Sequence, residues 1–206
     1  MANDTRERIV TVARDLVHGA SLAQVSTEDV CKAAGVHKGS LYHFFPSKNA
    51  LAAAVLERNW DMMSTVLEES FATDVGPLER IDRFVDGFAG MLALMRQRMG
   101  ATPGCPLGGL AAEMAGLGAE ARAQVGRILT GWTRYFTSAI GEARDRGEIE
   151  ASTDPGEAAT RLLAHLQGHA LMARAYDDPD MLRRAKPGLR MLLGARPSAA
   201  ERPSGG

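Results

Sequence analysis

The stretch STEDVCKAAGVHKGSLYHFFPSK, residues 26–48, decides the fold of the N-terminal part of this chain. Ser26 or Thr27 can cap a helix, because a hydroxyl there accepts a hydrogen bond from a free backbone N–H of the first turn. Gly35 is the residue type that most often ends a helix in a left-handed conformation, and Pro46 cannot continue a helix that precedes it. The sequence therefore predicts two short helices joined by a tight turn, at 27–34 and 38–44.

The second of these predicted helices has two different faces. Helical spacing turns Leu41 and either Phe44 or Phe45 inward. The opposite face carries mainly hydrogen-bond donors, namely Lys38, Ser40, Tyr42 and His43. In a helix-turn-helix, the second helix enters the major groove of DNA with its N-terminal residues nearest the base edges. The pattern therefore predicts a DNA-binding helix-turn-helix.

Roughly residues 6–56 resemble the TetR/AcrR family of bacterial transcriptional regulators. The residues that carry the match are Thr27, Ala-Ala-Gly-Val at 33–36, Gly-Ser-Leu-Tyr at 39–42, Phe45 and Lys48. The resemblance implies a homodimeric repressor that binds a palindromic operator in double-stranded DNA. It further implies that a small effector binds in a C-terminal helical body, and that two long helices of each subunit form a four-helix interface.

By this resemblance, eight residues are expected to contact DNA. Lys38, Gly39, Ser40 and Tyr42 would face the groove, whereas Thr27, Tyr42, His43 and Lys48 would hold phosphates. His37 stands where the family often has a small polar residue, so it either alters the choice of operator or caps the turn. The alternative role for Tyr42 is partial packing of its ring in the core.

The charge of the whole chain argues against a broad basic surface. It has 24 Lys and Arg against 25 Asp and Glu, for a formal net charge of -1. Residues 30–48 differ, since they contain three lysines, two histidines and no acidic residue. Such a small positive patch touches few phosphates, so useful affinity requires a second copy on the next major groove.

Ala, Leu, Met, Glu and Arg recur at helical spacing and alternating β-branched patterns are missing, so the predicted fold class is all-α. About nine helices are expected, at 5–18, 27–34, 38–44, 48–71, 77–98, 106–115, 119–146, 155–176 and 179–193. Residues 1–47 should form a three-helix head that binds DNA, and residues 48–195 a larger helical bundle for effector binding and dimerisation. Residues 196–206 should be a disordered tail, because they offer little to bury.

Two further features bear on the compartment. The sequence shows neither a signal-peptide core nor an apolar run of membrane length, so we expect a cytoplasmic protein with no membrane partner. Cys31 and Cys105 lie in unlike contexts and give no disulfide framework, which fits a reducing compartment. Cys31 lies mid-helix beside small apolar residues and is expected to be structural.

Cys105 is a candidate sensor because it lies just before a predicted helix, whose first turn suits Pro106. Free backbone N–H groups there would favour the thiolate, the form that attacks electrophiles. The segment GCPLGGLAAEM, 104–114, resembles that of a TetR subgroup that includes the N-ethylmaleimide-reductase repressor, where the matching cysteine responds to electrophiles. Pro106 departs from that pattern. The alternative is a structural Cys105 and a reversible apolar effector.

A pocket for a small apolar or electrophilic effector is expected between the body helices, although methionines and aromatics also fill ordinary cores. The candidate pocket residues are Cys105, Trp60, Phe88, Met91, Met95, Trp132, Phe136, His165 and His169. The two histidines are four residues apart, but no further Cys or His ligands accompany them. We therefore expect no metal and no cofactor, and place the histidines at the pocket or the subunit contact.

The long predicted helices 119–146 and 155–176 are the candidates for the dimer contact. Gly131 and Gly168 would permit close approach there, or are merely tolerated. An enzyme is not expected, because no nucleophile elbow or phosphate loop accompanies Cys105 and the histidines. An adaptor that uses the helix-turn-helix as a protein-binding scaffold is a further alternative.

Overall fold

The computed structural model describes residues 2–72 and 74–195, and every regular element in that part of the chain is helical. The helices are α1 (Ala2–Gly19), α2 (Thr27–Ala34), α3 (Lys38–Phe44), α4 (Lys48–Phe71), α5 (Pro77–Met99), α6 (Gly108–Ala115), α7 (Ala119–Asp145), α8 (Pro155–Tyr176) and α9 (Lys186–Leu192), with the 3-10 turns η1 (Pro179–Met181) and η2 (Arg183–Ala185). The predicted all-α class with about nine helices is confirmed. The predicted disordered tail, 196–206, lies outside the described residues.

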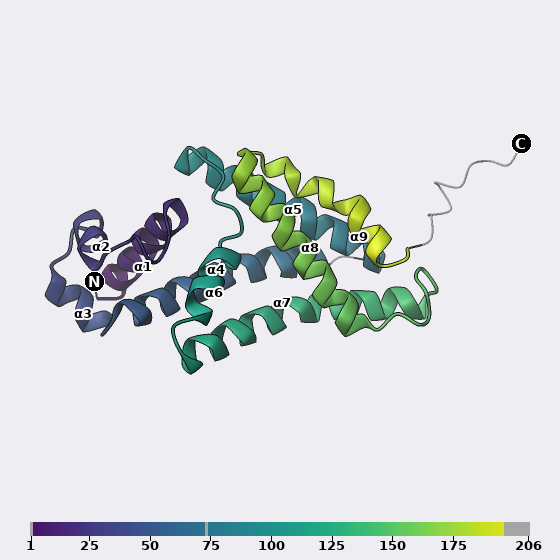
Figure 1. The fold of residues 1–206 in the computed structure, drawn as a ribbon, viewed down its shortest axis with the longest axis horizontal. Coiled ribbons are helices and arrows are strands. Elements are labelled where there is room, and N and C mark those ends of the chain that lie inside the picture. Colours follow the sequence, from purple (N-terminus) through teal and green to yellow (C-terminus); the bar gives the residue numbers. More distant parts are fainter. Residues whose placement is uncertain (1, 73, 196–206) are drawn as a thin grey trace, which may run out of the picture.

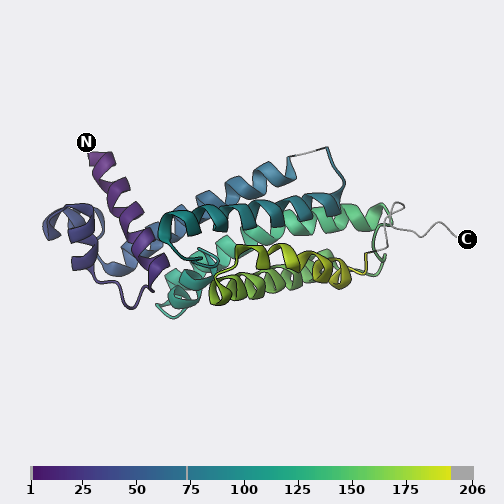
Figure 2. The ribbon, with the colours of Figure 1, turned by 90° about the horizontal axis from the view of Figure 1, so that it is seen from above.

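Helices α1–α3, which we call the head, form one end of the molecule, and α4–α9, which we call the body, form the rest (Figure 1). Helix α4 begins against the head and continues far into the body. Seen from above, the long body helices run side by side along the length of the molecule (Figure 2). Among the described helices, α4 therefore links the two parts as one continuous rod.

Local hydrogen bonds define the turn of the head. The Ser26 hydroxyl accepts the Asp29 N–H at 3.1 Å, and the Asp29 carboxylate accepts the Ser26 N–H at 2.9 Å. This reciprocal capping box satisfies two backbone donors at the start of α2. Gly35 ends the helix with a φ of 63°, a left-handed conformation that costs glycine little. The two helices 27–34 and 38–44 are confirmed.

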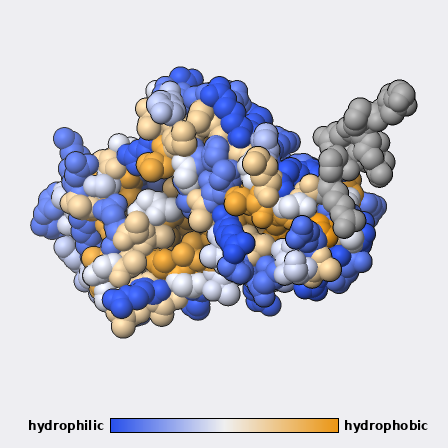
Figure 3. All heavy atoms as spheres, turned by 45° about the vertical axis from the view of Figure 1, so that its right-hand side comes forward, coloured by the Kyte–Doolittle hydropathy of each residue, from blue (hydrophilic) through white to orange (hydrophobic). Residues whose placement is uncertain are grey.

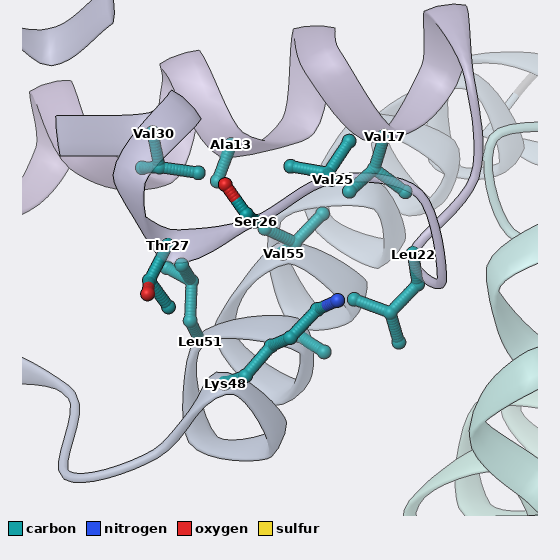
Figure 4. A pocket seen from close by; sticks show the side chains of 11 residues that line it. Ala13, Val17, Leu22, Val25, Ser26, Thr27, Val30, Lys48, Leu51 and Val55 are labelled. Carbon is teal, nitrogen blue, oxygen red and sulfur yellow. The ribbon is translucent and has the colours of Figure 1, made fainter. Parts of the chain in front are cut away.

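The interior of the head is filled. Leu41, Phe45 and Ile9 are each at most 3% exposed. The cavity between α1, the start of α2 and α4 measures only about 10 Å³, and apolar side chains such as Val17 and Leu51 surround it (Figure 4). A space of this size holds one water at most, so it is not an effector site.

Aromatic side chains fill the centre of the body. Phe84 and Phe88 on α5 meet Trp132 on α7, and both ring pairs are edge-to-face with centroids 5.9 Å apart. These three residues and Phe136 are 0% exposed. Edge-to-face rings add to the stability that burial of their area provides.

Three predicted helix boundaries are wrong. The helix expected from residue 5 begins at Ala2. The helix expected at 106–115 begins at Gly108, because Pro106 and Leu107 lie in a turn before it. The helix expected at 179–193 is instead two 3-10 turns followed by α9. In an unbroken α-helix the N–H of residue 187 would bond to the carbonyl of residue 183. Pro187 has no N–H, so a new helix begins at Lys186.

None of the helices in residues 2–72 and 74–195 is long and apolar enough to cross a membrane.

Candidate DNA-binding face and effector cavity

The outer face of α3 lies open to solvent. Lys38, Gly39, Ser40 and His43 are exposed, as is Tyr42, at 43%. His37 is the N-cap residue of α3, and its side chain makes no capping hydrogen bond within the described chain. The His37 carbonyl accepts the Leu41 N–H at 3.2 Å, so His37 caps the turn through its backbone, and its effect on the choice of operator stays a prediction.

The phosphate-binding candidates surround this face. Thr27 begins α2, and its hydroxyl lies 3.5 Å from the hydroxyl of Tyr42, in the second half of α3. Lys48 is the first residue of α4, and its Nζ donates to the Ala23 carbonyl at 3.5 Å. A lysine beside free helix N–H groups is a suitable site for a phosphate.

Lys38 is engaged in the free protein, because it forms an ion pair with Glu28 on α2. The pairing raises the pKa of Lys38 and lowers the pKa of Glu28. Both side chains are exposed, so the pair adds little stability. Phosphate oxygens can therefore replace Glu28 as the partner of Lys38 at small cost.

A larger cavity lies in the body, with a volume of about 560 Å³, which suits a small ligand. Its walls come from α6, α7, α8 and the segment before α6, and the lining residues are Pro103, Gly104, Cys105, Gly108, Gly109, Ala111, Ala112, Ala115, Val125, Leu129, Gln167, Ala170, Leu171 and Arg174. Most of this lining is apolar. Figure 3 shows that apolar side chains reach the surface of the molecule in patches between hydrophilic ones.

Cys105 is a free, partly buried thiol in the cavity wall. The Gly108 N–H at the start of α6 donates to its Sγ at 3.3 Å, as the position before a helix predicts. Burial nevertheless raises the pKa of Cys105 and outweighs that bond. The prediction of a favoured thiolate is therefore wrong, since desolvation penalises the charged sulfur more than one N–H stabilises it.

Gln167 on α8 lies opposite this thiol. As a hydrogen-bond partner, its amide lowers the pKa of Cys105, by less than burial raises it. The Gln167 Nε2 is buried and makes no hydrogen bond of standard geometry within the described residues. A Cβ on Gly108 would lie 2.2 Å from Gln167 Oε1, so a glycine there leaves room for the amide.

The other candidate pocket residues are dispersed. Phe88, Trp132 and Phe136 belong to the closed core described above. Trp60 lines a separate cavity of about 370 Å³ with Gly131, Arg134, Tyr135 and Ser138. Met91 and Met95 are half-buried on α5. The structure thus does not bring them together with Cys105, and a ligand role for them stays a prediction.

The rings of His165 and His169 pack against each other at an angle of 54°, with centroids 4.4 Å apart. His165 Nε2 lies 3.3 Å from the Ala185 carbonyl, and the ring covers Gly188 of α9. His169 Nδ1 lies 3.2 Å from the His165 carbonyl. The structure shows no group of three or more metal-binding side chains among the described residues. His165 therefore packs α8 against the C-terminal helical turns.

Three hydrogen bonds join the cavity region to the head, and sequence reasoning missed them. The Glu113 carboxylate on α6 accepts the N–H groups of Leu22 and Ala23, at 3.1 and 3.0 Å. Arg174, in the cavity wall, donates to the Ala20 carbonyl at 3.4 Å. We call these three bonds the joint. Within the body, the buried Asn59 of α4 donates its Nδ2 to the Pro106 carbonyl at 2.8 Å.

His18 lies buried at the end of α1, close to this joint. Burial and the charge of Arg14 lower its pKa to about 4. The charge of Asp15 and the amide of Asn59 oppose part of the shift, although neither ring nitrogen of His18 has a hydrogen-bond partner of standard geometry in the described chain. The imidazole is therefore neutral at pH 7.

The fold and these surfaces agree with comparisons to known proteins. Residues 9–55 match the family model of bacterial regulatory proteins of the tetR family, and residues 77–189 match the tetracyclin repressor-like C-terminal domain. The transcriptional regulator AcuR of Cereibacter sphaeroides is 30% identical over 165 residues, 78% of this chain and 72% of AcuR. The HTH-type transcriptional repressor NemR of Escherichia coli is 27% identical over 172 residues, 84% of this chain and 85% of NemR.

Solved structures agree with the sequence relatives. The regulatory protein TetR from Rhodobacter sphaeroides superposes with a TM-score of 0.79 at 26% identity and covers 91% of this chain and 97% of its own. The reduced form of Escherichia coli NemR gives a TM-score of 0.76 at 23% identity over 94% of this chain and 100% of its own, a likeness of fold. The two family models fall on the helix-turn-helix and on most of the body. The chain therefore belongs to the TetR family of ligand-responsive, DNA-binding transcriptional regulators.

Proposed function

We propose that this protein is a homodimeric repressor that releases a palindromic operator when a small effector occupies the cavity at Cys105. In this proposal residues 1–47 bind DNA, and residues 48–195 bind the effector and the second subunit. The observation that carries the DNA-binding part is the open outer face of α3, where Lys38, Ser40 and Tyr42 are all exposed. Two such faces on successive major grooves require a two-fold dimer.

The proposed roles of the eight DNA contacts follow from position. Lys38, Gly39 and Ser40 occupy the N-terminal turn of α3, the part of a recognition helix that approaches base edges. Thr27, Tyr42, His43 and Lys48 surround this turn and bind phosphates, and His37 adjusts the choice of operator. Phosphate contacts fix the register on the duplex, whereas base contacts discriminate between sequences.

Exposed apolar residues on α8 support the proposed subunit contact. Leu171 and Met172 are 68% and 39% exposed, and Ala164 and Gly168 continue the stripe at helical spacing. A Cβ on Gly168 would meet nothing within 4 Å in the described chain, so a second helix can approach closely. Gly131 on α7 differs, because the Trp60 ring of the same chain covers it.

The joint supports the proposed coupling between effector and DNA. Arg174 touches both the cavity and the head, and Glu113 extends from α6, whose first turns line the cavity. An effector that changes the position of α6 or Arg174 alters the hydrogen bonds that the joint makes to the turn between α1 and α2. The effector lowers the population of the DNA-binding state only to the extent that it binds the other state more tightly.

A second candidate for the effector is a reversible apolar ligand with a structural Cys105. The observation that favours it is the raised pKa of the thiol, which leaves less thiolate at neutral pH to react with an electrophile. The mainly apolar lining of the cavity suits both candidates.

Duplex binding to the upstream region of its own gene, with and without 1,4-benzoquinone, tests the proposal for wild type and Cys105→Ser in parallel. Release of the wild type but not of the variant assigns the response to the thiol. If both release the duplex, or neither does, the electrophile response through Cys105 is wrong and reversible ligands are tested instead. Lys48→Ala should weaken all duplexes alike, whereas Ser40→Ala should change the ranking of sequences. Equal effects of Ser40→Ala on every duplex would contradict its base-reading role.

A further inference from the structure

We infer that a second ligand site lies between α4 and α7, where Trp60 and Arg134 bind a small aromatic carboxylate. The site is the cavity of about 370 Å³ that Trp60 lines. This cavity shares no lining residue with the one at Cys105. The inference is therefore separate from the proposed effector site, and its failure would leave the proposed function unchanged.

Trp60 provides a flat apolar surface in the wall. Its side chain is half-buried, and a Cβ on Gly131 would lie 3.0 Å from its Cζ2. The glycine therefore lets the indole lie directly against the backbone of α7, which fixes the ring, while the same residue lines the cavity. An aromatic ring of a ligand can pack on an indole that is held in this way.

Arg134 supplies a positive charge that has no partner. Every arginine in residues 2–72 and 74–195 except Arg98 and Arg134 makes a hydrogen bond or an ion pair with another described residue. Of these two, only Arg134 lines a cavity. A guanidinium binds a carboxylate through two parallel hydrogen bonds, so this group favours a ligand that carries a carboxylate.

No acidic side chain of the cavity wall competes for Arg134, because the lining contains none. Glu57 lies three residues before Trp60 on α4, but it is already engaged. Its carboxylate accepts a hydrogen bond from Gln124 at 2.7 Å and lies 3.7 Å from the guanidinium of Arg127. The charge of the cavity wall is therefore positive, and it attracts an anion.

Two hydroxyl groups complete the wall. Ser138 follows Arg134 by one helical turn on α7, and Tyr135 lies beside it, with its ring edge-to-face against Phe71 at 5.5 Å. Neither hydroxyl bonds to another described residue, so both can donate to the ligand. One aromatic surface, one cation and two hydroxyl donors in a cavity of about 370 Å³ suit a one-ring carboxylate.

The test is a titration of the full-length protein with benzoate, followed by isothermal titration calorimetry and tryptophan fluorescence. Trp132 is 0% exposed, so the fluorescence change is expected from Trp60. Arg134→Gln should weaken binding about tenfold or more, because the paired hydrogen bonds are lost. Arg98→Gln removes the other unpaired arginine, which lies on the exposed surface of α5, and should bind as the wild type does.

Two further measurements separate the ring from the charge. Benzamide keeps the ring without the charge, and cyclohexanecarboxylate keeps the charge without the flat ring, so each should bind about tenfold more weakly than benzoate. Trp60→Leu should remove the preference for benzoate over cyclohexanecarboxylate while it keeps the preference for benzoate over benzamide.

Three outcomes would overturn the inference. The first is that benzoate does not bind the wild type. The second is that Arg134→Gln and Arg98→Gln bind benzoate equally well, which would mean that the cavity makes no specific contact with the carboxylate. The third is that Arg174→Gln, and not Arg134→Gln, loses binding, since Arg174 lines the cavity at Cys105 and benzoate would then lie there.

Discussion

Glu113 on α6 accepts the backbone N–H of Leu22 at 3.1 Å, so a carboxylate of the body holds the turn that leads into the helix-turn-helix. The same carboxylate accepts the N–H of Ala23. These two charge-assisted bonds are both shorter than the 3.4 Å bond from Arg174, so Glu113 is the contact of the joint that an effector must most affect to reorient the head.

Replacing Glu113 by alanine should release both of these backbone donors. We expect the amides of Leu22 and Ala23 to exchange hydrogen about tenfold faster, because their bonds open without global unfolding. Hydrogen exchange followed by mass spectrometry measures this. Glu120→Ala, which removes an exposed carboxylate from α7, is the matched control. Unchanged exchange at residues 22 and 23 would show that Glu113 does not hold the turn in solution.

Removing the partner of Lys38 should strengthen DNA binding. Glu28→Gln frees Lys38 for phosphate and removes a negative charge from the DNA-facing side, so affinity should rise several-fold for all duplexes. The gain should shrink as salt is added. The control is Glu79→Gln, which breaks the exposed ion pair with Arg83 on the body. A change of sequence preference in Glu28→Gln would mean that Lys38 reads bases from its paired position.

The close approach of α4 and α5 should tolerate no methyl group at Gly87. A Cβ there would lie 2.9 Å from Cγ1 of Val66, a β-branched side chain with little rotamer freedom, so Gly87→Ala should cost about 1–2 kcal/mol. On the same helix, a Cβ at Gly90 meets no described atom within 4 Å. Gly90→Ala should therefore raise the free energy of unfolding by up to about 1 kcal/mol. Urea denaturation of both variants checks the difference, and equal effects would contradict it.

Acid should destabilise the fold through His18. Its pKa is about 4 in the folded protein against 6.5 for an ordinary histidine, so between these pH values the unfolded chain is protonated at His18 and the folded chain is not. The contribution of His18 to the free energy of unfolding is therefore fully present above about pH 6.5. It is lost as the pH drops toward 4, by about 3 kcal/mol at most.

Substitution by a residue that does not titrate isolates this contribution. His18→Leu should lose less stability between pH 7 and pH 5 than the wild type does, as urea denaturation at the two pH values measures. His43→Leu, on the exposed face of α3, is the control. An identical pH dependence in His18→Leu and wild type would place the acid sensitivity elsewhere.

A charge in the exposed α8 stripe should separate the subunits. Ala164→Glu places a carboxylate among the apolar side chains of the proposed two-fold contact, so light scattering at micromolar concentration should show monomers. Leu94→Glu changes a residue of α5 that is 57% exposed and lies outside the stripe, and should leave the dimer intact. If Leu94→Glu and not Ala164→Glu dissociates it, the interface lies on α5.

Local signals in the sequence predicted the head well. Ser26, Gly35 and Pro46 act on their immediate neighbours, so their effects on helix ends follow from residue type alone. The body helices were found from their periodicity, which indicates that a face is buried but not which element covers it. Trp132 and Phe88 therefore qualified equally as pocket or as core before the fold was known.

The joint and the cavity could not be predicted in the same way. Glu113 and Leu22 are 91 residues apart, and no spacing rule connects such positions. The raised pKa of Cys105 depends on how much protein surrounds the sulfur, which is a property of the assembled fold. This burial opposes the local effect of the N–H groups at the start of the helix, which lower the pKa. Gln167 carried no motif, and only its place beside Cys105 in the fold distinguishes it.

The continuity of α4 turns small displacements into large ones. Its 24 residues form a rod that is about 36 Å long, so a tilt of about 5° about one end moves the other end by about 3 Å. In a two-fold dimer the spacing of the recognition helices would change by about twice that, against a groove repeat of about 34 Å. Such a tilt of α4 needs no rearrangement inside the tightly filled head. A small ligand can therefore release the head from DNA while its three helices stay packed as they are.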